Sequence, residues 1–487
     1  MSGSGILAAG AYVPQLRLQR AAMAAAMTWF NPALAGQGKG ERSMANWDED
    51  TLTMAIEASR DCLSGHDRST VRRVILASTT LPFADRLNAG VVKEALNLSD
   101  GLFALDMTGS QRAGSSALLA ALEGAASRPT LCVASENRRA KPASDAEFTN
   151  GDAAAAFLVG AGDTIADFLG SHSMTLDFVD HFRAPDRAYD YEWEGRWIRD
   201  EGYRKLIPPV VRDALDALGL DAGAVDHFIT ALPVSGIDRT LAADVGVRPE
   251  AVGASLRETL GYAGSAHPLV LLAQVLETAK PGALIVLVSF GQGCDVLAFR
   301  VTDAAERPRH ALGVTGWLAR RRPETNYLKH LSFSGAVELD GGMRAEIDLR
   351  QSPSMLYRER KTILSFVGGR CRETGTVQYP KTAISVARNA RLVNTQDDYP
   401  MAELRAEIVS FTADRLAYSP DPPNCYGIVA FEGGGRLMAD FSDVDPDTLS
   451  VGQSMRMMFR LRREDGSGFR HYFWKAVPDY RPAPGGE

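Results

Sequence analysis

The sequence lacks three features that would point to a membrane or a nucleic acid. No apolar run approaches the roughly 20 residues that a spanning helix needs, so we expect no membrane partner. The 487 residues carry 53 Lys and Arg against 60 Asp and Glu, a formal net charge of −7, and the basic runs are short and scattered. A polyanion-binding surface needs clustered positive charge, so nucleic acid is not an expected partner either.

Cysteine is also scarce. The five cysteines are odd in number and too widely spaced for a disulfide framework or a pair of Cys-x-x-Cys motifs: Cys62, Cys132, Cys294, Cys371 and Cys425. The N-terminus shows no signal-peptide pattern. We therefore expect a soluble protein of the reducing cytoplasm. At this length, with 45% hydrophobic residues, the chain can bury the cores of two or three domains.

The stretch 105–118 carries the strongest local pattern. An apolar run, 101–105, meets small and polar residues and then an Ala- and Leu-rich run, 118–125. This order predicts a buried strand that turns sharply into a buried helix. Backbone N–H groups at a helix N-terminus favour negative charge, so such an elbow suits a nucleophile or an oxyanion. A tight turn without chemistry fits the pattern equally well.

The pattern of strands and helices occurs twice before residue 303. We predict strands at 4–14, 73–78, 130–135 and 150–159, and again at 225–230, 283–290 and 295–301, with helices at 19–27, 205–218, 237–245 and 268–279. We expect an α/β fold of two duplicated halves, 1–165 and 166–303. An aromatic and charged insert, 177–203, opens the second half and suits a substrate wall or packing.

The C-terminal third differs from the rest. Residues 304–323 are rich in Arg and Pro and are predicted to be a linker. Residues 324–487 alternate apolar and polar positions between Gly, Pro and Asp turns, which predicts a small antiparallel all-β barrel. Its expected strands are 335–339, 383–386, 404–412, 425–431, 436–441, 454–462 and 471–475.

These motifs together resemble a known family. Residues 1–303 resemble the thiolase superfamily, in the branch of hydroxymethylglutaryl-CoA synthase and ketoacyl synthase III, at 106–118, 150–156, 196–206 and 289–293. The resemblance implies duplicated βαβαβ halves in a five-layered fold. Residues 324–487, with a motif at 370–390, resemble the OB-fold proteins that accompany thiolase-like enzymes, in which a zinc ribbon precedes the barrel.

The resemblance also implies catalytic positions, and this chain departs from each of them. The nucleophilic Cys of the superfamily falls on Gln111 and the expected His on Ala231. The position of the family's acid/base Glu falls on 78–80, which read Ser-Thr-Thr in this chain. The position of the family's Asn/His in the last motif falls near Tyr262. Acyl transfer through a cysteine thioester is therefore not expected.

Three residues remain as catalytic candidates. Gln111 can donate a hydrogen bond to an enolate-like oxygen, or it can be a polar filler in an inactive pocket. Tyr262 and His267 can act as general acid and base on a thioester enolate or alkoxide, although a His at a helix start is commonly a capping or packing residue. His181 and Tyr203 of the insert are second-line candidates.

Ser110, Gly291 and Gly293 are candidates for contacts to the acyl-CoA substrate. The two glycines would leave backbone N–H groups open to an oxyanion, although a tight turn explains them equally well. Glu136 and Asp152 follow strands, where structural roles are more common.

No metal and no tightly bound cofactor are expected. A structural zinc ribbon needs four thiolates, and the matching positions are Cys371, Thr374, Ser385 and Arg388. A single thiol cannot hold zinc there. The ribbon is then expected to be held by packing or by the partner domain.

Three functions follow from this sequence. The first is an enzyme that makes or breaks a C–C bond next to an acyl-CoA thioester, in Claisen, aldol or retro-aldol chemistry, without a catalytic Cys. The second is a catalytically inactive acyl-CoA-binding or scaffolding subunit for an active thiolase-like partner. The third is an ordinary synthase with an unexpected nucleophile. A homodimer is expected, with a further thiolase-like subunit as a possible partner.

Overall fold

A computed structural model describes residues 3–124, 128–307, 311–342, 351–389 and 391–480. Its contacts divide the chain into two compact units. The first comprises Met1–Asn46, Asp50–Lys93 and Leu98–Val337, and the second comprises Trp47–Glu49, Glu94–Asn97 and Glu338–Glu487. The division thus falls after Val337, later than the predicted linker 304–323.

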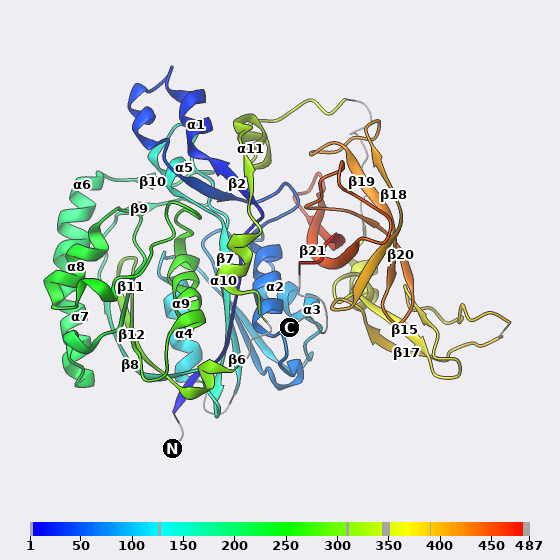
Figure 1. Ribbon diagram of the computed structural model, residues 1–487, viewed down its shortest axis with the longest axis horizontal. Coiled ribbons are helices and arrows are strands. Elements are labelled where there is room, and N and C mark those ends of the chain that lie inside the picture. The colour runs from blue at the N-terminus through cyan, green and yellow to red at the C-terminus, as the bar shows by residue number, and fades with distance from the viewer. Residues whose placement is uncertain (1–2, 125–127, 308–310, 343–350, 390, 481–487) are drawn as a thin grey trace. The chain divides into compact units, whose positions relative to one another are not determined.

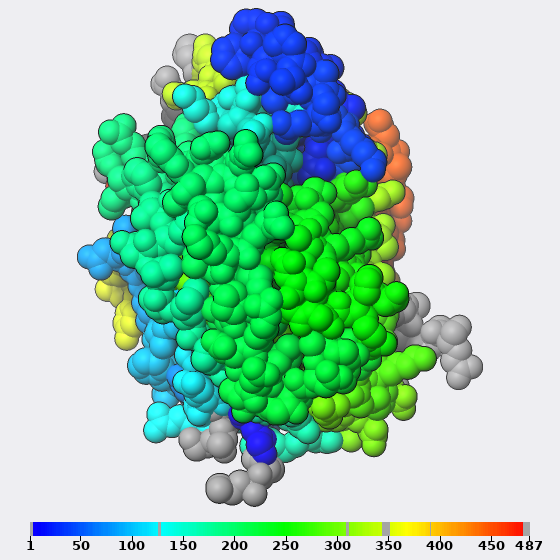
Figure 2. All heavy atoms as spheres, turned by 90° about the vertical axis from the view of Figure 1, so that its left-hand side faces the viewer, coloured from blue at the N-terminus to red at the C-terminus, as the bar shows by residue number. Residues whose placement is uncertain are grey.

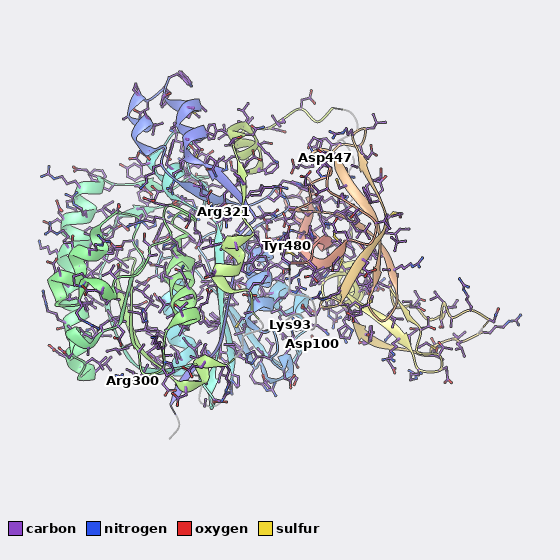
Figure 3. The ribbon with its side chains drawn as sticks, in the orientation of Figure 1. Lys93, Asp100, Arg300, Arg321, Asp447 and Tyr480 are labelled. Atoms are coloured by element: carbon purple, nitrogen blue, oxygen red, sulfur yellow. The ribbon has the colours of Figure 1, made fainter. Side chains whose placement is uncertain are left out.

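The predicted linker contains folded elements of the first unit. Helix α10 (Gly313–Ala319) packs on β1 (Ser4–Tyr12). Strand β14 (Arg322–Glu324) pairs with β2 (Leu16–Gln19), which in turn pairs with β3 (Glu41–Met44). Arg321 Nη1 lies 3.3 Å from Glu41 Oε1 at this small sheet (Figure 3). Arg and Pro content alone did not reveal these pairings.

Nine of the described strands form the main sheet of the first unit, in the order β11-β12-β13-β8-β1-β7-β6-β4-β5. The first half supplies β1, β4 (Arg73–Ala77), β5 (Phe103–Met107), β6 (Thr130–Glu136) and β7 (Ala153–Ala161). The second half supplies β8 (Ala166–Thr175), β11 (His227–Thr230), β12 (Leu284–Phe290) and β13 (Gly293–Val301). A short pairing of β1 with β8 joins the two halves.

Helices cover both faces of each half and make the predicted five layers (Figure 1). Helices α4 (Ala113–Glu123) and α9 (His267–Thr278) contact strands of both halves and form the central layer. Helices α2 (Thr51–Cys62) and α10 pack on the first half, and α7 (Arg204–Leu218) and α8 (Ile237–Val245) pack on the second. Figure 2 views the surface on the side of α7 and α8.

Burial on both faces explains the sequence of the central strands. Strand β12 reads LIVLVSF and is buried at every position, because helices lie on both sides of it. Helix α2 is likewise buried throughout and begins with a capping box, in which the Asp50 side chain accepts from the N–H groups of Leu52 and Thr53.

The remaining elements of the chain up to Phe333 are short. Apart from short 3₁₀ turns, they are α1 (Arg20–Met27), α3 (Asn88–Ala95), α5 (Asp145–Thr149), β9 (His181–Phe182), β10 (Tyr191–Glu192), α6 (Gly195–Trp197), the π-helical turn η3 (Ile198–Tyr203) and α11 (Tyr327–Phe333). Lys93 of α3 forms an ion pair with Asp100 (Figure 3). None of the helices in the described parts of the chain is long and apolar enough to cross a lipid bilayer.

The second unit contains the predicted barrel. Five antiparallel strands run in the order β20-β19-β18-β21-β22, with the bounds β18 (Arg405–Asp414), β19 (Asn424–Phe431), β20 (Arg436–Asp440), β21 (Ser454–Glu464) and β22 (Arg470–Pro478). An isolated bridge pairs Phe441, which follows β20, with Ala476 of β22. This bridge brings the two edges of the sheet together and nearly closes the barrel. This topology confirms the predicted OB fold.

Two predicted barrel strands are wrong. Residues 335–339 form a turn and an irregular segment, and in 383–386 only Ile384 makes an isolated bridge, to Val393. Both are short apolar runs without the partner strand that would supply the rest of a ladder. The ribbon region instead contains β15 (Val367–Cys371), β16 (Val377–Gln378) and β17 (Gln396–Pro400), preceded by α12 (Pro353–Arg358) and α13 (Arg360–Ile363).

Candidate active site

The structure contains the predicted elbow between β5 and α4, and Gln111 lies on it. This side chain is 6% exposed and immediately precedes Arg112, the N-cap of α4. Arg112 Nη1 donates to Met174 O at 2.9 Å and to Asp295 Oδ1 at 3.1 Å. Asp295 also accepts from Ser115 at 3.0 Å. The second half of the fold therefore fixes the residue next to Gln111.

The Gly-rich turn of the last motif packs directly on this elbow. Ser110 Oγ donates to Gly291 O at 2.9 Å, and the Gly291 N–H donates to Gly293 O at 2.9 Å. A Cβ on Gly291 would lie 2.7 Å from Ser110 Oγ, and one on Gly293 would lie 2.0 Å from Met174 O. The geometry supports the tight-turn interpretation, because the Gly291 N–H already has an acceptor and Ser110 is used in the same turn.

A cavity of about 270 Å³ lies beside Gln111 within the first unit. Its polar lining comes from both halves and from the insert. The side chains that matter for chemistry are Gln111, Arg138, Asp180, His181, Tyr203 and Tyr262. The structure thus brings together two of the three predicted catalytic residues and both second-line candidates.

His181 and Asp180 form a carboxylate–imidazole pair in the cavity wall. His181 Nδ1 lies 2.9 Å from Asp180 Oδ1, and Asp180 also accepts from the His181 N–H at 2.9 Å and from Gln292 Nε2 at 3.2 Å. The His181 side chain is 16% exposed. A carboxylate on Nδ1 fixes the tautomer in which Nε2 is free to accept a proton.

Tyr262 and Tyr203 present phenol groups to the same cavity. They are 5% and 4% exposed. Burial raises the pKa of both, although the charge of Arg138 acts in the opposite direction. Each phenol therefore stays protonated at neutral pH and is a hydrogen-bond donor.

Arg138 is a buried cation that sequence reasoning missed. It is 6% exposed, and its Nη2 forms an ion pair with Asp190, which Arg183 Nη1 also contacts at 2.8 Å. Burial lowers the pKa of Arg138, but the charge of Asp190 and the hydrogen bond to it outweigh this cost, so that the pKa is raised. Among the described residues, neither Arg138 Nε nor Gln111 Oε1 has a hydrogen-bond partner.

His267 does not fit the predicted acid–base role. It lies beneath Tyr262, with ring centroids 5.2 Å apart, and the residues that line the cavity do not include it. Its Nδ1 accepts from the Ala263 N–H at 3.3 Å, and its Nε2 lies 3.0 Å from Ser255 O. Both ring nitrogens hold the turn that carries Tyr262, so the geometry supports the packing alternative.

The burial of His267 predicts an acid-labile fold. Burial lowers its pKa from 6.5 to about 4, so between these values the unfolded chain binds a proton that the folded chain does not. The free energy of unfolding should therefore fall as the pH drops from 6.5 to 4, by up to about 3 kcal/mol from this group. Urea unfolding of wild type and His267→Gln at pH 7 and pH 4.5 measures it. An equally steep pH dependence in the variant would contradict the assignment.

The acidic residues that follow strands are structural. Glu136 accepts from the Thr79 N–H and from Ser265 Oγ, each at 2.6 Å, and Asp152 accepts from the Ala45 N–H at 2.8 Å. These hydrogen bonds satisfy both carboxylates, and neither residue lines the cavity, which supports the structural interpretation.

No thiol lines the cavity. All five cysteines lie in described residues and are buried, and the cavity wall contains none of them. Burial raises the pKa of the Cys62, Cys132 and Cys294 thiols, which makes them poor nucleophiles.

The ribbon residues do not fit a zinc ion. Cys371 Sγ lies 3.2 Å from Thr395 Oγ1, and hydrogen bonds from Thr374 and Thr395 lower its pKa to about 6. One thiolate with hydroxyl neighbours does not make the tetrahedral site that zinc requires. Across the described ranges, no group of three or more His, Cys, Asp or Glu side chains is placed to hold a metal ion.

Sequence reasoning could have found part of this site. Asp180 and His181 are adjacent, and Arg138 follows the carboxyl end of a predicted strand, where ligand-facing loops of α/β sheets lie. Nothing in the sequence indicated that these segments meet at Gln111.

The C-terminal unit matches a known domain family. Residues 399–460 match the model of the ChsH2 C-terminal OB-fold domain, which agrees with the barrel of β18 to β22.

The first unit is similar to proteins of one enzyme family. The hydroxymethylglutaryl-CoA synthase of Thermococcus gammatolerans is 30% identical over 316 residues, which cover 63% of this chain and 89% of that protein. A crystal structure of HMG-CoA synthase complexed with CoA shares the fold with a TM-score of 0.61 at 17% identity, over 72% of this chain and 95% of that one.

A second solved structure extends the likeness to the ketoacyl synthases. The 3-oxoacyl-(acyl carrier protein) synthase III of Pseudomonas aeruginosa has a TM-score of 0.55 at 21% identity, over 62% of this chain and 99% of that one. Together with the duplicated halves and the elbow, these matches show that the chain belongs to the hydroxymethylglutaryl-CoA synthase family of the thiolase superfamily, with an OB-fold domain fused to its C-terminus.

Proposed function

We propose that this protein makes or breaks a C–C bond next to an acyl-CoA thioester without a cysteine-bound acyl intermediate. The observation that carries the proposal is Gln111, an amide on the elbow where the superfamily places its nucleophile. The names of its relatives, hydroxymethylglutaryl-CoA synthases, and the CoA complex of a structural neighbour support an acyl-CoA substrate.

An aldol-type condensation would use the groups that the cavity offers. His181, oriented by Asp180, takes a proton from the carbon next to the thioester. The resulting enolate attacks the carbonyl carbon of a second substrate and forms the C–C bond. The protonated His181 then returns the proton to the new alkoxide, which becomes a hydroxyl. Cleavage is the same sequence in reverse, so protons balance in either direction.

Hydrogen-bond donors stabilise the enolate oxygen. Tyr262 stays protonated because burial raises its pKa, and its phenol donates to the thioester oxygen as negative charge develops. The Gln111 amide N–H groups are a second donor set. The proposed acid–base pair is thus Tyr262 with His181, in place of Tyr262 with His267.

A serine nucleophile has less support. Ser110 Oγ donates to Gly291 O at 2.9 Å and also lies 3.3 Å from the Arg112 N–H, which donates to it. Neither contact is with a general base that could activate the hydroxyl.

Mass spectrometry tests the absence of a covalent step. After incubation with acetyl-CoA, the wild-type protein should keep its mass, because no thiol faces the cavity. The Gln111→Cys variant is the matched control and should gain an acetyl group, since the N-terminus of α4 lowers the pKa of a thiol placed there. An acetylated wild-type protein would overturn the proposal.

Turnover separates this proposal from the inactive-subunit alternative. Wild-type protein that forms or cleaves 3-hydroxyacyl-CoA on its own supports the enzyme. Protein that binds acyl-CoA without turnover and co-purifies with a thiolase-like subunit supports the scaffold. The homodimer and the cytoplasmic location remain predictions.

A further inference from the structure

The turn between β12 and β13 carries a strained residue. The two strands pair as far as Phe290 and Cys294, so Gly291, Gln292 and Gly293 form a three-residue hairpin loop. Gln292 has a φ of +49°. This left-handed conformation costs free energy in a residue with a Cβ, and hairpin loops usually place Gly, Asn or Asp in it. Both neighbours are glycines, so the side chain at this position needs an explanation.

The side chain of Gln292 reaches the carboxylate of the carboxylate–imidazole pair. Its Nε2 donates to Asp180 Oδ1 at 3.2 Å. The same oxygen accepts from the His181 N–H at 2.9 Å and lies 2.9 Å from His181 Nδ1. Gln292 is not part of the cavity wall. It therefore contacts the group that orients the imidazole from behind that wall.

The side chain of Asp180 needs such a contact to stay in one orientation. Hydrogen bonds already hold its main chain, since its N–H donates to Phe178 O at 3.1 Å and its C=O accepts from the Trp193 N–H at 3.0 Å. Neither bond restricts rotation about the side-chain torsions. Among the described residues, Gln292 supplies the one side chain from outside the insert 177–203 that hydrogen-bonds this carboxylate.

The hairpin is a more rigid support than the insert itself. Strands β12 and β13 pair at every position from Leu284 to Phe290, and β12 is buried throughout. Within the insert, β9 and β10 pair over two residues each, and Trp193 beside them is 55% exposed. A donor on the main sheet therefore restricts the pair more than contacts within the insert do.

We propose that Gln292 is a positioning residue for the reaction: its amide holds the Asp180 carboxylate against His181 Nδ1, so that Nε2 stays free to take the proton. This inference rests on the proposed function, in which His181 is the general base. The left-handed backbone of Gln292 is the consequence of placing the amide there, because strain persists in proteins where a functional site requires it.

Nitrogen NMR of the histidine side chains tests the orientation directly. The chain has eight histidines, and comparison with His181→Ala identifies the signals of His181. In the wild type, the neutral imidazole of His181 should carry its proton on Nδ1 in about nine-tenths of the molecules or more, because the carboxylate fixes this tautomer. Gln292→Met keeps the length of the side chain and removes the donor. It should lower the Nδ1–H fraction to about a half or less.

Activity gives a second readout. Gln292→Met should lower kcat about tenfold and leave KM within about twofold, because the residue acts on proton transfer and does not line the cavity. In a His181→Ala background the same substitution should change kcat by less than about twofold, since no imidazole remains to be oriented. Equal losses in the two backgrounds would assign Gln292 a general structural role and overturn the inference.

Gln292→Gly separates positioning from stability. Glycine adopts a φ of +49° without strain, and the variant lacks the amide. Its thermal unfolding midpoint should be no lower than that of the wild type, while kcat falls as in Gln292→Met. Gln274→Met is the matched control, because Gln274 is a half-buried glutamine on α9 away from Asp180. It should leave the His181 tautomer and kcat unchanged.

The outcomes separate this inference from the proposed function. A His181 tautomer that Gln292→Met leaves unchanged overturns the positioning role and leaves the proposed function standing, as does a Gln292→Gly variant with wild-type kcat. Absence of turnover in the wild type overturns the proposed function, whereas the tautomer of His181 decides the positioning contact without any turnover. A tautomer and a kcat that both depend on Gln292, but not on Gln274, support the inference.

Discussion

Replacing Tyr262 by phenylalanine is expected to lower kcat for C–C bond formation or cleavage by about 10²- to 10³-fold, the usual cost of removing one oxyanion donor. The variant keeps the aromatic ring that packs 5.2 Å from His267 and removes only the phenol oxygen. The substrate thioester would then lose a donor as negative charge develops on its oxygen.

The comparison with Tyr203 makes this test specific. Tyr203 lines the same cavity, but its ring packs edge-on against Phe290 at 5.2 Å, and it lies on η3 and not on the turn 261–264 that adjoins Gln111. Tyr203→Phe should lower kcat by less than about tenfold, the scale of an ordinary hydrogen bond. Wild-type kcat in Tyr262→Phe, or a larger loss in Tyr203→Phe, would show that the donor is assigned to the wrong tyrosine.

Replacing Arg460 by methionine is expected to destabilise the C-terminal unit by about 3–5 kcal/mol, the range measured when one partner of a buried ion pair is removed. Arg460 lies on β21 and is fully buried. Its Nη2 contacts Asp443 at 2.7 Å and its Nη1 contacts Glu49 at 2.9 Å. Methionine fills much of the volume but leaves these acidic groups without their shared cation.

The surrounding charges explain why the loss is large. Asp48 is buried in the same cluster, and Lys475 Nζ lies 2.9 Å from it. Burial raises the pKa of Asp48, but the charges of Lys475 and Arg460 outweigh it, so the pKa lies below its ordinary value. Without Arg460, Asp48 loses one of the two cations that lower its pKa.

Urea unfolding followed by tryptophan fluorescence measures this effect, since Trp474 is buried in the same unit, with its Nε1 donating to Leu364 O at 2.9 Å. The exposed pair of Arg372 and Asp397, 2.7 Å apart, supplies the control: Arg372→Met should change the free energy of unfolding by less than about 1 kcal/mol. Similar losses in the two variants would mean that burial does not determine the contribution of Arg460.

Much of the fold followed from local patterns. Continuous apolar runs such as β12 and β6, and the small-residue turn into α4, predicted buried strands and the elbow correctly. Alternation predicted the barrel strands, because one face of β18 and of β19 is buried and the other is more exposed, whereas β21 and β22 are buried at most positions. The pattern was misleading at 335–339, where a short apolar run lacks a partner strand.

The site was less accessible to sequence reasoning, because its members converge from distant segments. Gln111 and Tyr262 were predicted as site residues from the motifs to which they belong. His267 shares a turn with Tyr262, and sequence proximity suggested a catalytic pair, whereas the fold turns the imidazole toward Ser255 and Ala263. Arg138 had no motif to mark it.

The sequence by itself determined the duplicated α/β halves, the appended barrel and the loss of the thiol at the elbow, because periodicity and residue type are local properties. The tertiary structure decided which polar groups face one another. Strand order brings the segments that carry Arg138, His181 and Tyr262 to one cavity beside Gln111. Those are long-range properties, set by how the halves pack on α4 and α9.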